Sequence, residues 1–141
     1  GNSVFEEKTL RVLKEKNIDI ICLAGFMKIL SDNFIKSFSK PILNIHPSLL
    51  PSFRGLNTYQ RALNAGSLIH GATVHQITKD VDQGPILGQV IMRIAENTTA
   101  EKMEEDLLPQ EHLLYKRVLR EFLKRNGKKI LLIGPAAELQ N

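Results

Sequence analysis

The sequence contains a single cysteine, and it lacks both a long apolar run and an N-terminal targeting pattern. One thiol cannot form a disulfide within the chain, so a small disulfide-stapled fold is excluded. Cys22 lies in an apolar run and is predicted to be a core residue, in a protein of a reducing, cytoplasmic compartment. No stretch approaches the roughly 18 consecutive apolar residues that a transmembrane helix needs. No basic segment leads into an apolar one as in a signal peptide, so we expect no membrane partner.

Metal-dependent proteins and nucleic-acid-binding proteins are both disfavoured, because the sequence has few residues in the patterns that these classes need. Histidine, cysteine and acidic residues do not recur at the spacing of metal ligands, so we expect no metal requirement. The net charge is +4, yet the basic residues gather only near the end of the chain, at helical spacing (Lys116, Arg117, Arg120, Lys124, Arg125). We interpret these side chains as a solvated helix face, so no nucleic-acid partner is predicted.

Length and periodicity indicate one α/β domain over residues 1–141. The chain is 43% hydrophobic and 24% charged, an ordinary globular balance, and it has no internal repeat. Apolar residues at helical spacing predict helices at 4–16, 32–38, 58–65 and about 98–124. Apolar or alternating runs predict strands at 18–24, 41–47, 72–77, 86–94 and 128–133. This alternation predicts a mostly parallel sheet flanked by helices, in which ligands bind beyond the carboxyl ends of the strands.

Local signals predict details of two helices. Ser31 before Asp32 is a candidate N-cap of the helix at 32–38. Thr98 and Glu101 have the spacing of a capping box at the start of the long last helix. Pro109 lies inside that helix, and we expect it to kink or split the helix near Leu108, because proline removes a backbone donor.

A polar pair interrupts the apolar strand at 41–47. Asn44 and His46 are two residues apart, so their side chains share one face of the strand, close to its carboxyl end. An amide donor and an imidazole that titrates near neutral pH can together stabilise an oxyanion on a carbonyl under attack. The alternative is a hydrogen-bonded polar pair that only fixes the following loop.

Asp82 is the candidate carboxylate partner of this pair. It precedes Gly84 and Pro85, so it is predicted to lie in a tight turn. A carboxylate beside an imidazole can orient the ring and accept protons through water, although an aspartate in a turn can equally well cap its own backbone. Thr73 and His75 share a strand face, and each is either a residue of the site or a satisfied strand residue.

Five segments in order resemble the phosphoribosylglycinamide formyltransferase family. They are Leu23–Leu30, Asn44–Pro51, His70–His75, Val81–Ile86 and Gln110–His112. The resemblance covers roughly residues 5–125, and one such match would be weak whereas five in order are strong. It implies a Rossmann-like formyltransferase fold and transfer of a formyl group from 10-formyltetrahydrofolate, the co-substrate, to the amine of glycinamide ribonucleotide in purine synthesis.

The resemblance also implies roles for individual residues. By carry-over, Asn44 and His46 stabilise the oxyanion, and Asp82 orients His46 and a water and helps to remove the proton of the attacking amine. The residues that would hold the folate are Met27, Lys28, Ile29, Leu30, Lys79, Asp80 and Val81. Glu111 matches the glutamate that binds the ribose hydroxyls of the nucleotide, and its alternative is a solvated helix position.

The sequence departs from the family pattern in three ways. Family members start with a strand and a glycine-rich loop that holds the substrate phosphate on backbone amides, and this chain has neither. We therefore expect the C-terminal, catalytic part of the fold without its N-terminal strands, and a sheet edge left open in this way would favour a homodimer. Pro109 stands close to Glu111, and Asn57, Thr58 and Tyr59 replace a more histidine-rich stretch.

Three other functions remain open at this point. A 10-formyltetrahydrofolate hydrolase would share the Asn, His and Asp but use water as acceptor, and Leu49-Leu50 after His46 favours the transferase. Methionyl-tRNA formyltransferase typically has alanine where Pro47 stands, and it carries a further RNA-binding domain. An inactive folate-binding fragment would keep folate affinity when Asn44 or His46 is replaced, whereas an enzyme would lose turnover.

Overall fold

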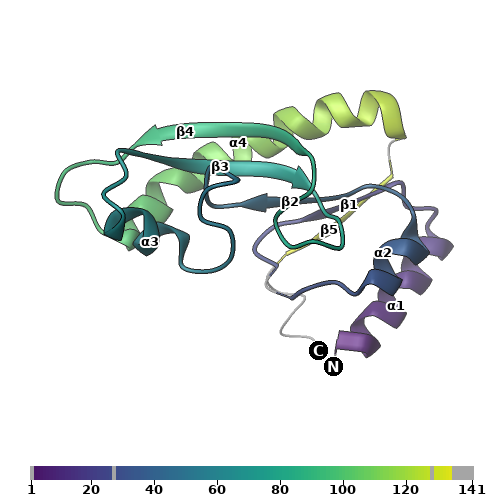
Figure 1. The fold of residues 1–141 in the computed structure, drawn as a ribbon. Coiled ribbons are helices and arrows are strands. Elements are labelled where there is room, and N and C mark those ends of the chain that lie inside the picture. Colours follow the sequence, from purple (N-terminus) through teal and green to yellow (C-terminus); the bar gives the residue numbers. More distant parts are fainter. Residues whose placement is uncertain (1, 27, 128, 135–141) are drawn as a thin grey trace.

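The computed structural model describes residues 2–26, 28–127 and 129–134. Helices and strands follow one another along these residues in the arrangement drawn in Figure 1. In chain order they are α1 (Asn2–Glu15), β1 (Ile20–Leu23), α2 (Asp32–Phe38), β2 (Ile42–His46), α3 (Thr58–Asn64), β3 (Ile69–Gln76), β4 (Ile86–Arg93), α4 (Ala100–Asn126) and β5 (Ile130–Ile133).

The strands form one five-stranded sheet in the order β4-β3-β2-β1-β5. β1 runs parallel to β2 and to β5, whereas β3 runs antiparallel to β2 and to β4. The predicted α/β architecture is confirmed, but the sheet is evenly mixed and not mostly parallel. The reason is that β3 runs antiparallel beside β2, and β4 then folds back on β3. No helix lies between β3 and β4, so these two strands form an antiparallel hairpin.

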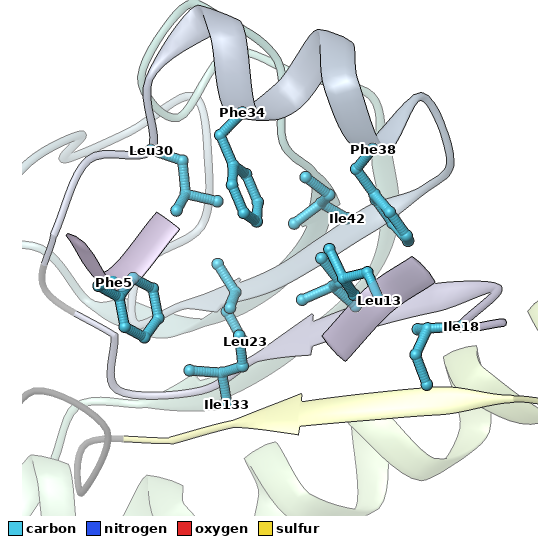
Figure 2. Packing of buried hydrophobic residues seen from close by; sticks show 10 residues of the cluster. Phe5, Leu13, Ile18, Leu23, Leu30, Phe34, Phe38, Ile42 and Ile133 are labelled. Carbon is cyan, nitrogen blue, oxygen red and sulfur yellow. The ribbon is translucent and has the colours of Figure 1, made fainter. Parts of the chain in front are cut away.

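Two layers of helix cover the sheet. Figure 2 shows Phe34 and Phe38 of α2 and Leu13 of α1 packed against Ile42 and Leu23 of the sheet. On the opposite face, α4 packs on the remaining strand residues through a row of partly or fully buried side chains, which are Leu114, Tyr115, Val118, Leu119, Phe122 and Leu123. Cys22 is buried under α4, as the apolar run predicted.

The long helix differs from its prediction at two points. Its N-cap is Thr99, whose hydroxyl accepts a hydrogen bond from the backbone N–H of Lys102, and not Thr98. The helix is also not divided at Pro109, so the split that was one of the two predicted outcomes is wrong. Leu107 and Leu114, on either side of the proline, are both buried, and this packing outweighs one missing backbone bond. Within the part of the chain described here, no helix is long and apolar enough to cross a membrane.

Candidate functional site

The register of β2 and β3 assembles the centre of the site. Asn44 on β2 lies opposite His75 on β3, and His46 lies opposite Thr73. Side chains directly opposite each other in an antiparallel pair are close neighbours. Four polar residues therefore meet where β2 ends, although the neighbouring strand positions are apolar.

Asp82 reaches this cluster from the loop between β3 and β4. Its Oδ1 lies 3.7 Å from Nδ1 of His46 and 3.9 Å from Nε2 of His75. Its Oδ2 accepts a 2.9 Å hydrogen bond from the backbone N–H of Gly55. The carboxylate therefore faces the two imidazoles and does not merely cap its own turn. The structure brings Asn44, His46 and Asp82 together, and their catalytic roles stay predictions.

His46 has an acceptor at each ring nitrogen. Nε2 lies 3.0 Å from the backbone carbonyl oxygen of Phe53, and a carbonyl can only accept, so the ring donates from Nε2. Nδ1 then faces Oδ1 of Asp82. The ring therefore lies between oxygens from two different loops, with its hydrogen bond at Nε2 and the carboxylate of Asp82 at a longer distance from Nδ1.

His75 is a residue of the site that the sequence left undecided. It is only 2% exposed, and burial lowers its pKa in spite of the nearby Asp82, so the ring is neutral at pH 7 and the 3.9 Å contact is not an ion pair. Its Nε2 lies 3.4 Å from Nδ2 of Asn44, and a neutral ring can accept from that amide. One amide hydrogen of Asn44 is used in this way, and the other, which has no partner among the described residues, can donate to a ligand. The register of β3 with β2 brings His75 into the site, and the local sequence does not encode that register.

The proposed folate residues lie in two loops. Leu30 is buried, Ile29 is exposed, and Nζ of Lys28 lies 5.6 Å from the ring centroid of Phe5. Met27 lies outside the described residues. Lys79, Asp80 and Val81 form the exposed stretch of the second loop, immediately before Asp82. The structure thus places this second group beside the cluster, while the first follows β1.

Glu111 lies on α4, near α3, and not in the central cluster. It is half-buried, which contradicts the alternative of a fully solvated helix position. Burial, and then the charge of Glu104, raise the pKa of Glu111 to about 7. Tyr59 of α3 is affected by this carboxylate. Burial, and then the charge of Glu111, raise the pKa of Tyr59. No direct hydrogen bond joins Glu111 to Asn44, His46 or Asp82 among the described residues.

This environment predicts a pH dependence of stability that belongs to Glu111. Between pH 4.5 and about 7, Glu111 keeps its proton in the folded state but has lost it in the unfolded state. The free energy of unfolding should therefore fall as the pH rises through that window. Glu111→Gln should flatten this fall, as measured by urea unfolding from pH 4.5 to 8. Glu121→Gln, an exposed position on the same helix, is the control and should follow the unmodified protein. Equal pH profiles of the protein and Glu111→Gln would contradict the prediction.

A cavity of about 250 Å³ adjoins the cluster on the side of α3. Its lining includes Pro47 and Ser48, which follow His46 directly, and Tyr59 and His70. The residues that line the cavity include no aspartate, glutamate, lysine or arginine, and burial lowers the pKa of His70, which favours the neutral ring. Within residues 2–26, 28–127 and 129–134, no group of three or more His, Cys, Asp or Glu side chains could hold a metal ion.

The sequence and the fold have counterparts among known proteins. Residues 1–119 match the family model described as formyl transferase. The chain belongs to the formyl transferase family. In the phosphoribosylglycinamide formyltransferase of Haemophilus influenzae, 110 residues are 46% identical, covering 78% of this chain and 52% of that protein. The trifunctional purine biosynthetic protein adenosine-3 of Bos taurus is 41% identical over 120 residues, which are 85% of this chain and 12% of that protein.

A solved structure supports the same membership of the formyl transferase family. The crystal structure of phosphoribosylglycinamide formyltransferase from Brucella melitensis superposes with a TM-score of 0.80 at 44% identity, covering 93% of this chain and 66% of that one. The formyltransferase fold predicted from the sequence is therefore confirmed. The chain spans about half the length of the Haemophilus relative and about an eighth of the trifunctional protein.

Proposed function

We propose that the chain transfers a formyl group from 10-formyltetrahydrofolate to the amine of glycinamide ribonucleotide. The observation that carries this proposal is the cluster in which Asp82 faces His46 while Asn44 keeps one amide hydrogen free. The names of the relatives, phosphoribosylglycinamide formyltransferase and a trifunctional purine biosynthetic protein, support the formyl group and its acceptor, and the folate donor is what the sequence resemblance implies. We infer that this chain is the C-terminal, catalytic part of such a domain, and that it works in the cytoplasm, as its single buried thiol suggests.

The chemistry follows from the donors and acceptors of the cluster. The substrate amine attacks the formyl carbon, and the carbonyl oxygen becomes an oxyanion. Asn44 donates its free amide hydrogen to that oxygen, which stabilises the transition state more than the ground state. His46 donates as well once the oxyanion replaces the carbonyl of Phe53 at Nε2. Asp82 accepts the proton of the amine through a water, and a proton is returned by the same route to the folate nitrogen. The carbonyl then re-forms, the bond between the formyl carbon and the folate nitrogen breaks, and tetrahydrofolate leaves as the neutral amine.

Binding of the two substrates is assigned to the surrounding segments. Met27, Lys28, Ile29, Leu30, Lys79, Asp80 and Val81 are proposed to hold the folate in the two loops described above. Glu111 is proposed to accept hydrogen bonds from the ribose hydroxyls, which its ionised form does best. The proposed steps use only hydrogen-bond donors and a carboxylate, so activity should survive treatment with a chelator.

The test follows release of deformylated folate from 10-formyltetrahydrofolate by the purified chain, with and without glycinamide ribonucleotide. Release that requires the nucleotide is the expected result. Release that ignores the nucleotide would replace the proposal by a hydrolase. Folate binding without release would replace it by an inactive folate-binding fragment.

A homodimer is a further part of the proposed function, and its support is the open edge at β5. This strand pairs with β1 on one side only within the described sheet, and Leu132 is 72% exposed. Unpaired strand edges favour association with another strand. Light scattering over a range of protein concentrations measures the mass, and a constant monomer mass would contradict this part of the proposal.

A further inference from the structure

The loop that follows His46 is held against the sheet by side chains and not by strand pairing. The hydroxyl oxygen of Thr73 accepts a 3.1 Å hydrogen bond from the backbone N–H of Leu50 and donates a 2.7 Å bond to the carbonyl of Ser48. Nε2 of Gln89 donates to the carbonyl of Leu50 at 2.9 Å and to the hydroxyl oxygen of Thr73 at 3.0 Å. β3 and β4 thus each contribute one side chain to the same loop.

The capacity of the Thr73 hydroxyl is completely used by these contacts. A hydroxyl has one hydrogen to donate and two lone pairs to accept with. The hydrogen goes to Ser48, and the lone pairs receive Leu50 and Gln89. Thr73 is fully buried, so no water can replace a lost partner without rearrangement. Loss of the hydroxyl leaves three polar groups of the loop and of Gln89 short of a partner at once.

The sheet register places this contact beside the proposed catalytic histidine. Thr73 lies opposite His46 on β2 and opposite Gln89 on β4. The loop that Thr73 and Gln89 hold runs on to Phe53, whose carbonyl accepts the hydrogen bond from Nε2 of His46. The hydroxyl of Ser48 donates to the carbonyl of Ser52 at 2.6 Å, which connects the held segment to the residue before Phe53.

We propose that Thr73 and Gln89 are positioning residues, which set the orientation of His46 by holding the loop from Pro47 to Phe53. The inference rests on the proposed function only in that His46 takes part in turnover. Neither side chain touches a substrate in this role. Each acts through the backbone of the loop on the carbonyl of Phe53, which accepts the hydrogen bond from Nε2 of His46.

The test compares Thr73→Val with Thr73→Ser in the full chain. Valine keeps the shape but removes the hydroxyl, so kcat should fall about 10-fold or more, since displacement of a catalytic group by about an ångström can cost as much. KM for the folate should change less than about 2-fold, because no folate contact is lost. Serine restores the hydroxyl and should keep kcat within about 2-fold of the unmodified protein.

A control and a second readout separate positioning from general stability. Thr9→Val removes another buried hydroxyl, which donates to the carbonyl of Phe5 at 2.7 Å in α1, and should leave kcat of the folded protein unchanged. The ring nitrogen signals of His46 in NMR spectra should shift in Thr73→Val and not in Thr9→Val. Gln89→Leu is the second variant if Thr73→Val does not fold, and it should shift the same signals in the same direction.

The outcomes are distinguishable from failure of the proposed function. If the unmodified chain transfers no formyl group, the proposed function fails, and the His46 signals alone decide on positioning. Unchanged His46 signals in Thr73→Val and Gln89→Leu would overturn the inference. An unchanged kcat in Thr73→Val, in a protein that is active, would overturn it as well.

Discussion

Replacing His46 with alanine is expected to lower kcat for formyl transfer by a factor on the order of 10², as loss of one oxyanion donor does in other enzymes. The imidazole is held between the carboxylate of Asp82 and the carbonyl of Phe53, so its orientation is fixed before a substrate arrives. Asn44 keeps its own free amide hydrogen in this variant, because that amide is held by His75 and not by His46. A measurable residual activity is therefore expected.

The measurement is single-turnover release of deformylated folate, together with the dissociation constant of the folate. The dissociation constant should stay within about 2-fold, since an interaction made only in the transition state changes turnover and not binding. His112→Ala is the control, because His112 lies on the exposed side of α4. Turnover of His46→Ala close to that of His112→Ala would remove His46 from the mechanism.

Replacing Asp82 with asparagine is expected to lower kcat by a factor on the order of 10² to 10³, the range for loss of a positioned acid or base. The carboxamide cannot take the proton of the attacking amine, and it carries no charge to pair with a protonated His46. Asparagine is the informative substitution because Asp82 has a positive φ of 54°, a conformation that asparagine adopts more readily than most residues. Its side-chain oxygen can also still accept from the N–H of Gly55.

Asp106→Asn provides the control for this second variant. Asp106 pairs with Lys102 at 2.8 Å on the surface of α4 and has no part in the proposed chemistry, so its loss should leave kcat unchanged. Circular dichroism of both variants confirms that the fold is kept. If Asp82→Asn turned over like Asp106→Asn, the carboxylate would have only the structural task of holding Gly55.

Local signals predicted those parts of the fold that are decided within one element. The helix at 32–38 was predicted with its bounds and with its cap, because the hydroxyl of Ser31 accepts from the N–H of Phe34 as the N-cap preference requires. β3 begins three residues before its predicted start at 72, and its first residues are ordered by pairing with β4. Strand direction and the passage of α4 through Pro109 depend on contacts between distant residues, which a local pattern does not contain.

The site divides in the same way. The alternation of Asn44 and His46 follows from the period of a strand, so their neighbourhood was predictable from two positions in the sequence. The contact of Asp82 with both histidines depends on how the loop after β3 folds back, and the turn signal alone left its direction open. His75 and Thr73 acquire their contacts from the register of β3 with β2, which tertiary structure fixes.

The parallel pair of β1 and β5 has a consequence for folding during synthesis. Ile20 is aligned with Ile130, and the backbone of Asp19 donates to the carbonyl of Lys129 at 2.7 Å, so the pairing joins residues 110 positions apart. Contacts of such long sequence separation form slowly, because a large loop must close before they stabilise anything. On the ribosome, β1 is made early and keeps an unpaired edge until β5 emerges. A nascent chain stopped before residue 130 should therefore be the species most prone to aggregate and most dependent on chaperones.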